Sequence, residues 1–233
     1  MRLQSFSRAI RRKAPLRVLA IGSSSTEGIG ASSPAHSYPA RFEAELKQRF
    51  KVQDVHVTNA GVGGETAEAS VARLEERLKQ NTYDLVVWQV GTNDAVKGDD
   101  EGRFRELLER GLQDAKAAKT ELVLLDQQFY PTIKDPVRYE RYVHMIETVA
   151  AEFNAPVMSR YRMMKTWAER APKDMTAMLS GDGFHMSDRG YECLATAMVG
   201  AVSDLVGDTT SAAVLTPTTA GDAPSTQISL SRR

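Results

Sequence analysis

Short apolar runs alternate with helical patterns along most of the chain, from about residue 16 to about residue 206. Such runs are typical of strands that are buried on both faces of a parallel sheet. Five runs have this character: residues 16–21, 55–57, 85–90, 122–125 and 156–158. Because strands that alternate with helices form βαβ units, the pattern predicts a single doubly wound α/β domain with a five-stranded parallel sheet.

Between these strands, apolar residues recur every three or four positions, which is the spacing of one face of an α-helix. The segments that show it are residues 42–50, 67–78, 104–112, 142–153 and 191–205. Ser187 stands shortly before the last of them, and its hydroxyl suits a helix N-cap. We therefore expect the last helix to begin close to Ser187.

The two ends of the chain differ from this pattern. Residues 1–15 are basic, and we expect them to form a solvated or loosely docked arm. The alternative is a short amphipathic helix whose Leu3, Phe6 and Ile10 make weak contact with a membrane surface or a partner. Residues 207–233 consist largely of Ser, Thr, Ala, Pro and Gly, so they are predicted to be a disordered tail.

The charge is balanced, with 30 Lys and Arg against 30 Asp and Glu and a formal net charge of +0. Because no overall field attracts polyanions, nucleic-acid binding is not expected. No run approaches the roughly 20 apolar residues of a transmembrane segment, and the N-terminal apolar run is too short for an export signal. The single cysteine, Cys193, excludes an internal disulfide and a cysteine zinc cluster. These features predict a cytoplasmic protein.

Small and polar residues follow the first three predicted strands, at residues 22–28, 59–66 and 91–94. A fourth such segment, residues 182–185, precedes the last helix. Each segment alone is typical of an ordinary turn, a phosphate-binding loop or a surface ion pair. Because the carboxyl ends of parallel strands share one edge of the sheet, where ligands bind, the four segments together favour a functional site at that edge.

These four segments match, in order, the sequence blocks of the SGNH hydrolases, or GDSL-type esterases and lipases, and the chain resembles this family over its predicted domain, residues 16–206. The resemblance implies a flavodoxin-like three-layer α/β/α sandwich and ester hydrolysis without a cofactor or a metal. It implies that Ser24 is the nucleophile of a catalytic triad with Asp182 and His185. It also implies that Ser24, Gly64 and Asn93 supply the donors of an oxyanion hole.

The sequence departs from the family pattern at Ser23, because the family has Asp before the nucleophile. This change puts in question the hydrogen bonds that support the turn, while the nucleophile itself is unchanged. Ser25 carries a second hydroxyl next to Ser24, and the spacing to Thr26 and Gly28 favours Ser24 as the attacking residue.

The chemistry of these residue types agrees with the resemblance. A serine hydroxyl attacks an ester only when an imidazole accepts its proton, and that imidazole needs an acceptor on its other nitrogen. His185 alone has an acid positioned for this, three residues earlier, at Asp182. At this spacing the carboxylate can fold back to Nδ1 and leave Nε2 to face Ser24. The backbone N–H groups of Ser24 and Gly64 and the Asn93 amide would stabilise the negative charge that develops on the carbonyl oxygen.

Two further segments have side chains suited to a substrate pocket. In residues 127–131, polar and aromatic groups either lie beside the site, as sugar recognition needs, or form a structural turn. The other segment is a group of Met and Trp side chains, for which core packing is the favoured interpretation and an adaptable acyl or alcohol pocket is the alternative. The group comprises Met158, Met163, Met164, Trp167, Met175 and Met178.

The sequence thus predicts a serine ester hydrolase that acts on small or medium esters, such as carbohydrate O-acetyl or short-chain acyl esters. A lysophospholipase, a thioesterase or an acyltransferase on the same site remains an alternative. An α/β-hydrolase is disfavoured because Thr26 replaces the last glycine of its Gly-x-Ser-x-Gly turn. The non-enzymatic alternative is a nucleotide- or phosphate-binding module, although neither a Gly-x-Gly-x-x-Gly nor a Gly-Lys-Ser/Thr motif is present.

Overall fold

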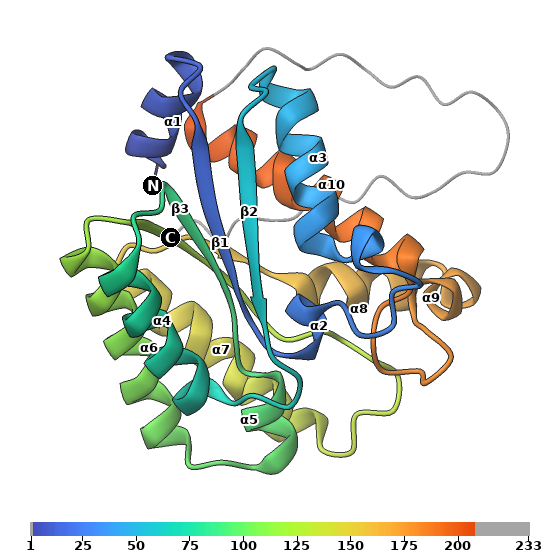
Figure 1. The fold of residues 1–233 in the computed structure, drawn as a ribbon. Coiled ribbons are helices and arrows are strands. Elements are labelled where there is room, and N and C mark those ends of the chain that lie inside the picture. Colours follow the sequence, from blue (N-terminus) through green and yellow to red (C-terminus); the bar gives the residue numbers. More distant parts are fainter. Residues whose placement is uncertain (1, 208–233) are drawn as a thin grey trace, which may run out of the picture.

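The computed structural model describes residues 2–207, which fold around one parallel sheet (Figure 1). The strand order is β2-β1-β3-β4-β5, and every neighbouring pair is parallel. This order is that of flavodoxin-like doubly wound sheets, so the predicted fold class is confirmed. The strands are β1 (Leu16–Gly22), β2 (Val55–Gly61), β3 (Leu85–Gln89), β4 (Glu121–Leu125) and β5 (Val157–Met158). The predicted tail lies outside the described residues, apart from Gly207.

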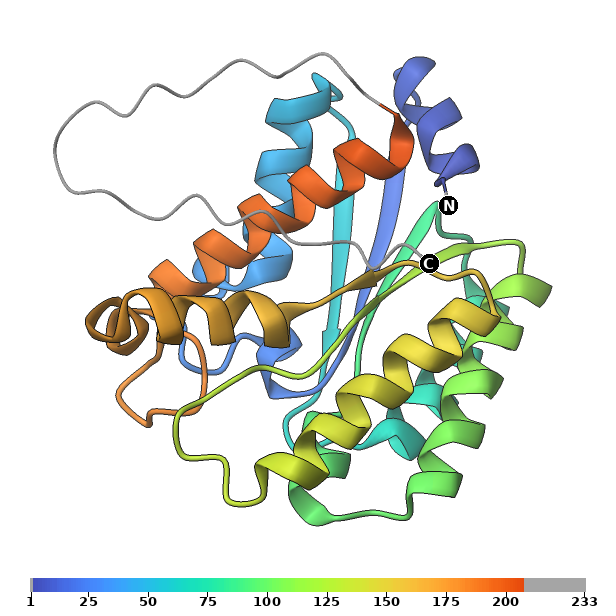
Figure 2. The ribbon, with the colours of Figure 1, turned by 180° about the vertical axis from the view of Figure 1, so that it is seen from behind.

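Helices cover both faces of the sheet (Figures 1 and 2). One layer contains α3 (Tyr38–Phe50) and α10 (Asp188–Val206), and the other contains α4 (Ala67–Gln80), α6 (Glu101–Ala117) and α7 (Pro136–Glu152). These are the five helices that the apolar spacing predicts. The hydroxyl of Ser187 accepts from the N–H of Gly190, so the predicted N-cap of α10 is also confirmed.

Strand β2 extends to Gly61, beyond the predicted end at residue 57. The polar residues Thr58 and Asn59 interrupt the apolar run, but β2 is an edge strand that pairs with β1 over its whole length. At its end, β2 packs directly against α2 (Ser24–Glu27): a Cβ on Gly61 would lie 1.9 Å from the backbone nitrogen of Glu27. Glycine at this position therefore lets the second polar segment approach the first.

Two helices that were not predicted, α8 (Arg160–Arg170) and α9 (Pro172–Met178), hold most of the methionine-rich group. Every member of the group is at least 96% buried within the described residues. These side chains pack in the core, as the favoured interpretation expected, and do not line an open pocket. The spacing of Met163, Met164 and Trp167 is that of one helix face, which is the signal that could have predicted α8.

The N-terminal segment forms helix α1 (Gln4–Arg11) and is docked more firmly than a loose arm. Leu3 and Phe6 are 3% and 0% exposed. The carboxylate of Glu121, at the start of β4, accepts from the backbone N–H groups of Ser5 and Phe6 at 2.9 and 3.0 Å. The structure therefore corrects the expectation of a solvated or loosely docked arm, because the apolar face of α1 forms part of the core.

The burial of this face bears on the alternative of a membrane or partner contact, because its apolar side chains are already occupied. Leu3 and Phe6 already pack inside the molecule, and Ile10 is half-buried against the core. Among residues 2–207, no helix combines the length and the apolar character that crossing a membrane requires.

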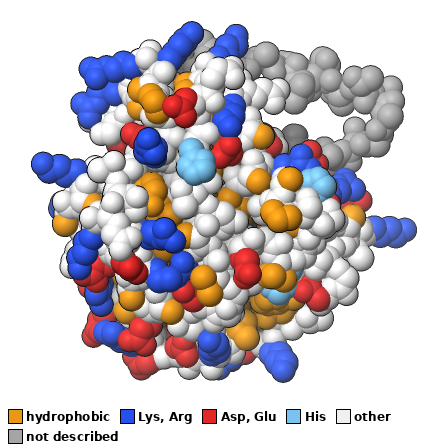
Figure 3. Space-filling model, in the orientation of Figure 1, with side chains coloured by type: hydrophobic (Ala, Val, Ile, Leu, Met, Phe, Trp, Pro, Cys, Tyr) orange, Lys and Arg blue, Asp and Glu red, His pale blue; other side chains and the backbone are white. Residues whose placement is uncertain are grey.

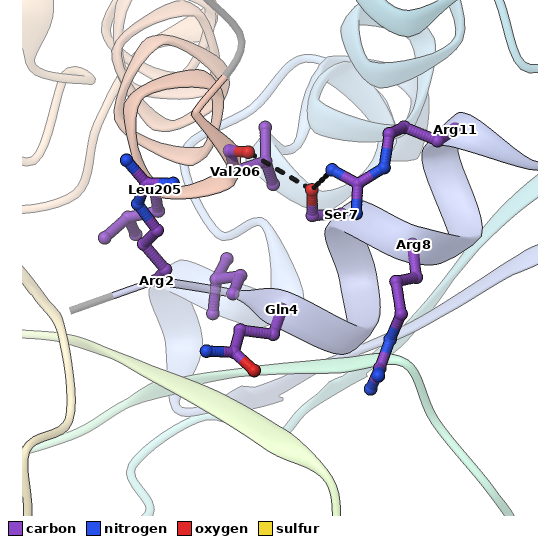
Figure 4. Close-up of a pocket in the computed structure, with 8 residues that line it drawn as sticks. Arg2, Gln4, Ser7, Arg8, Arg11, Leu205 and Val206 are labelled. Carbon is purple, nitrogen blue, oxygen red and sulfur yellow. Dashed lines mark hydrogen bonds between the residues drawn. The ribbon is translucent and has the colours of Figure 1, made fainter.

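A hollow of about 260 Å³ lies where α1 meets the end of α10 (Figure 4). Arg11 donates to the hydroxyl of Ser7 at 2.6 Å, and this hydroxyl donates to the carbonyl of Val206 at 3.1 Å. Arg2 lies beside Gly207, at the same helix end. Positive side chains stabilise a helix C-terminus because its last carbonyls carry partial negative charge. Some of the basic side chains that gather over α1 in Figure 3 thus help to hold α1 against α10.

Candidate active site

The candidate site lies at the carboxyl edge of the sheet, where β1 and β3 are neighbours. The direction of the chain crossovers changes between these two strands, since β2 lies beyond β1 and β4 lies beyond β3. Doubly wound domains bind ligands in the crevice outside such a switch point. Ser24 begins α2 directly after β1, and Asn93 lies in α5 (Thr92–Lys97) shortly after β3. The fold thus brings the first and third polar segments to one edge.

Ser24, His185 and Asp182 form a continuous hydrogen-bonded relay. Ser24 Oγ lies 2.9 Å from His185 Nε2, and His185 Nδ1 lies 2.6 Å from Asp182 Oδ2. The side chain of His185 is 16% exposed, so the imidazole is largely shielded, whereas that of Asp182 is 46% exposed. Because 161 sequence positions separate Ser24 from His185, the folded domain creates this contact and no local turn does.

The carboxylate of Asp182 fixes the proton on His185. Its Oδ1 atom accepts from the Ser180 hydroxyl at 2.7 Å and from the backbone N–H groups of Phe184 and His185, each at 2.9 Å. Partial burial alone would raise the pKa of Asp182, but these hydrogen bonds and the one from the imidazole lower it well below its usual value. An ionised carboxylate only accepts, so Nδ1 carries the hydrogen and the lone pair of Nε2 faces Ser24.

Gln89 supports the turn at Ser23, the position of the departure from the family pattern. Gln89 Oε1, at the end of β3, accepts from the N–H of Ser23 at 2.9 Å and from its hydroxyl at 3.1 Å. The hydroxyl of Thr26 donates to the same oxygen at 3.2 Å. An amide oxygen from the neighbouring strand therefore gathers the donors of this turn, and Ser23 adds a donor to it. Sequence reasoning missed Gln89 because its position inside an apolar run carries no turn signal.

The two adjacent hydroxyls of Ser24 and Ser25 point to different partners. Ser25 is 2% exposed and its hydroxyl donates to Gln128 Oε1 at 2.7 Å. Ser24 is half-buried and its hydroxyl faces the imidazole of His185. Of these two hydroxyls, only that of Ser24 faces the imidazole, and that of Ser25 is buried beneath it against Gln128.

The candidate oxyanion-hole donors lie on adjoining segments. Ser24 is the first residue of α2, so its backbone N–H has no carbonyl partner one turn earlier in the helix. Asn93 Nδ2 donates to the carbonyl of Glu65 at 2.7 Å, which ties it to the segment that carries Gly64. Gly64 has φ +78°, and a Cβ there would meet no atom within 4 Å. Glycine is thus needed for its left-handed backbone, and the space beside it is open.

Asp94 adds a second link between the end of β3 and this segment. Its Oδ1 atom accepts from the N–H of Ala67, at the start of α4, at 2.8 Å. Asp94 is 2% exposed, and this burial raises its pKa to about 6. Together with Asn93, it holds residues 64–67 against the end of β3. The sequence did not reveal this role because its partner, Ala67, lies on the segment that follows β2.

A second Ser–His–Asp cluster lies at the surface and lacks the geometry of a relay. The Ser32 hydroxyl and the Asp188 carboxylate both approach the same nitrogen of His36, Nδ1, at 2.7 and 2.9 Å. A relay needs the acid and the hydroxyl on opposite nitrogens, so this cluster cannot activate Ser32 through His36. Within the described part of the chain, no group of three or more His, Cys, Asp or Glu residues is arranged to hold a metal ion.

Comparison with known protein families now identifies the chain's relatives. The model of the Non-GDSL lipase-like family matches residues 1–208, which include the whole sheet, helix α1 and every segment of the site. The chain belongs to the Non-GDSL lipase-like family. The resemblance to SGNH hydrolases is thereby confirmed, and Gly22-Ser23-Ser24 in place of Gly-Asp-Ser agrees with the description of this family.

A curated relative of this Non-GDSL lipase-like chain is the "Thioesterase 1/protease 1/lysophospholipase L1" of Escherichia coli strain K12. The two sequences are 28% identical over 146 residues, which are 60% of this chain and 64% of that protein. The match thus spans less than two thirds of the curated relative's length.

Solved structures of similar fold include a lipase/acylhydrolase from Enterococcus faecalis, with a TM-score of 0.68 and 25% identity over 81% of this chain and 96% of that one. They also include a two-domain esterase, CEX, described as active on acetylated mannans, with a TM-score of 0.73 and 24% identity. That comparison covers 96% of this chain and 58% of the esterase chain. These likenesses support the three-layer fold of this Non-GDSL lipase-like protein.

Proposed function

We propose that this protein is a carboxylic ester hydrolase that forms an acyl-enzyme on Ser24. The relay from Ser24 through His185 to the ionised Asp182 carries this proposal. His185 Nε2 accepts the proton of the Ser24 hydroxyl while the serine oxygen bonds to the ester carbonyl carbon. The carbonyl oxygen becomes negative, and the donors of Ser24, Gly64 and Asn93 stabilise it.

The remaining steps use the same groups. The tetrahedral intermediate collapses when His185 gives its proton to the leaving alcohol, and the acyl group stays on Ser24. Water then attacks the acyl carbonyl, His185 accepts a proton from that water, and Ser24 leaves with the proton returned to it. Asp182 remains ionised throughout and stabilises the imidazolium that forms in each half of the reaction.

Small and medium acyl groups are the proposed substrates, in particular carbohydrate O-acetyl and short-chain acyl esters. The methionine-rich group that would line a deep acyl pocket is packed in the core, which leaves it unavailable to a long chain. The Phe184 ring lies 4.8 Å from the His185 ring and 4.8 Å from the Tyr130 ring. Phe184 is half-buried and packs on the buried Tyr130, so its ring offers an apolar surface beside the base, of the kind that an acetylated sugar ring can contact.

Turnover of p-nitrophenyl acetate, octanoate and palmitate, and acetate release from acetylated xylan, test the proposed substrate class. We expect acetate or octanoate ester turnover to exceed that of palmitate by at least about tenfold, and Ser24→Ala to abolish it. A preference for palmitate would contradict the proposed chain length, and undiminished turnover by Ser24→Ala would contradict the proposed nucleophile.

A long-chain hydrolase is the second candidate. Ile29 and Val62 are 42% and 44% exposed, and they lie on the segments that carry Ser24 and Gly64. An acyl chain of a lysophospholipid or a thioester could lie along such exposed apolar side chains, so the palmitate assay is the discriminating one. An acyltransferase would instead yield a new ester when an alcohol is added to the assay, because the acyl-enzyme would pass its acyl group to that alcohol.

A further inference from the structure

The segment after β4 places Gln128 between the two halves of the relay. Gln128 is 0% exposed. Its side-chain Oε1 accepts from the Ser25 hydroxyl at 2.7 Å, and its Nε2 donates to the carbonyl of Phe184 at 2.9 Å. Ser25 and Phe184 are the chain neighbours of the nucleophile and of the base. One buried amide therefore connects the residue after Ser24 with the residue before His185.

We propose that Gln128 is a positioning residue that sets the distance between Ser24 and His185 by bridging their chain neighbours. This inference rests on the proposed function, since it concerns how the same relay is held in place. Gln128 does not contact the relay atoms, so it acts through Ser25 and Phe184. We refer to its two hydrogen bonds as the Gln128 bridge.

The chemistry of the bridge requires an amide. The Phe184 carbonyl only accepts, so it needs the NH₂ group, and the amide oxygen is then directed to the Ser25 hydroxyl, which donates. A glutamate at 128 would be acceptor-only when ionised and would oppose the carbonyl, and a methionine would offer neither a strong donor nor a strong acceptor. Buried polar groups that lose a partner are destabilising, so the two segments are held at the spacing that the amide spans.

The core fixes the backbone of Gln128, from which the bridge extends. The hydroxyl of Tyr139, on α7, donates to the backbone carbonyl of Gln128 at 2.7 Å. Tyr139 is 2% exposed, and burial raises the pKa of its hydroxyl, so it stays protonated and remains a donor. The backbone at Gln128 is thus tied to α7, so the bridge holds the Phe184 turn to a buried point of the core.

The bridge also reaches the acid of the relay. The Phe184 peptide donates its N–H to Asp182 Oδ1, while the carbonyl of the same residue accepts from Gln128. Loss of the bridge would therefore free the turn that carries both Asp182 and His185. Because displacement of about 1 Å between reacting groups can cost about 100-fold in rate, a small movement of this turn matters for proton transfer.

Gln127 provides a matched control. It precedes Gln128, is also 0% exposed, and its Nε2 donates to the carbonyl of Tyr139 at 3.3 Å. Among the described residues, its side chain bonds to α7 and not to Ser25 or Phe184, so Gln127→Met removes a buried amide from the same segment without removing the bridge.

The test measures kcat and KM for p-nitrophenyl acetate in Gln128→Met and Gln127→Met, with each kcat divided by the active sites titrated with a fluorophosphonate. Because only folded protein reacts with the fluorophosphonate, this division corrects kcat for any unfolded fraction. We expect Gln128→Met to lower kcat by roughly 10- to 100-fold with KM within about twofold of wild type, and Gln127→Met to lower kcat by less than about threefold. Equal kcat values in the two variants, or a loss confined to KM, would overturn the positioning role.

Ser25→Ala keeps the proposal testable if Gln128→Met does not fold. It removes one oxygen atom and one end of the bridge, so kcat should fall while KM stays constant, and an unchanged kcat would overturn the proposal. Where both variants fold, Ser25→Ala combined with Gln128→Met should lose no more activity than Gln128→Met alone. If Ser24→Ala is inactive but Gln128→Met is as active as wild type, the bridge is refuted and the proposed function stands. If the wild-type protein itself shows no turnover, both are refuted.

Discussion

Asp182 determines the charge state in which His185 can work. Four hydrogen bonds converge on its carboxylate, three on Oδ1 and one on Oδ2. They lower its pKa well below the usual value for Asp even though the partial burial of the group acts in the opposite direction. The carboxylate therefore stays ionised on mild acidification, and it keeps accepting the hydrogen bond from His185 Nδ1.

The acid side of the pH–rate profile should accordingly contain no step from Asp182. A general base must be neutral to accept the proton of Ser24, so kcat/KM should increase with pH on the acid side of the profile and then level off. Asp182 should add no step on mild acidification, because its hydrogen bonds hold its pKa well below the usual value for Asp. Initial rates at constant ionic strength measure this limb. A flat profile would contradict the assignment of His185 as the general base.

Replacing the carboxylate by an amide should be far more damaging than its small size suggests. In Asp182→Asn, an NH₂ group that faces Nδ1 would force that nitrogen to accept, so Nε2 would carry the hydrogen and could not take the proton of Ser24. We expect kcat to fall by roughly 10³- to 10⁴-fold, with the fold retained. Steady-state kinetics beside a circular dichroism spectrum would measure both, and a loss below about tenfold would contradict the role of Asp182.

The residues of the relay could be predicted from the sequence, whereas their supports could not. Asp182 and His185 stand three positions apart and Ser24 follows a predicted strand, and the resemblance of these segments to the SGNH hydrolase blocks is what singled them out. Gln89 and Gln128 contact the nucleophile's turn from 66 and 103 positions away. Only the strand order places them there. A glutamine in an apolar run or a loop has no local feature that tells whether its side chain holds a neighbouring turn or faces solvent.

At the scale of elements, helix α6 packs on β3 through a glycine. A Cβ on Gly111 would lie 2.3 Å from the indole of Trp88, which is fully buried on β3. The indole N–H of Trp88 donates to the hydroxyl of Ser70, on α4, at 3.1 Å. The ring thus fills the space between α4, α6 and β3, the strand that precedes Asn93.

Two glycine-to-alanine variants should have opposite effects on stability. Alanine favours a helix over glycine by about 1 kcal/mol, but in Gly111→Ala the new methyl group collides with Trp88, so we expect a net loss of about 1–3 kcal/mol. Gly200, exposed in α10, has no atom within 4 Å of a new Cβ. Gly200→Ala should therefore gain about 0.5–1 kcal/mol. Urea unfolding measures both values, and a gain in both variants would contradict the packing at Gly111.

Element prediction succeeded where apolar spacing was long and regular. The five strands and the five long helices were recognised because each has a buried stripe of the correct period. The end of β2 was missed because Thr58 and Asn59 are polar at an edge strand, where backbone pairing does not require apolar side chains. Short helices such as α2 and α5 contain too few residues to show a period.

At the scale of the whole molecule, α1 joins the two ends of the described chain. Its Leu3 N–H donates to the carbonyl of Leu205, and its first turn is held by Glu121 of β4. The sequence suggested an arm because basic residues dominate the segment. Its two buried apolar residues are too few to predict docking, and their partners, near residues 121 and 205, are remote in sequence.

Phe6→Ala tests whether α1 belongs to the folded domain. The side chain is 0% exposed, so its removal should lower the free energy of unfolding by about 3–5 kcal/mol. Arg12→Ala, at an exposed position just after the same helix, should change it by less than about 0.5 kcal/mol. Thermal and urea unfolding provide the comparison. If the Phe6→Ala protein were as stable as the Arg12→Ala protein, the interpretation of residues 1–15 as a loosely docked arm would be correct after all.

The most direct test of the account is to label the protein with a fluorophosphonate and to locate the adduct by peptide mass spectrometry. If the relay activates Ser24, one phosphonyl group should attach to Ser24, labelling should slow on acidification because the base must be neutral, and Ser24→Ala should not react. A nucleotide- or phosphate-binding module would not be labelled. An adduct on Ser25, or no adduct at neutral pH, would contradict the central claim.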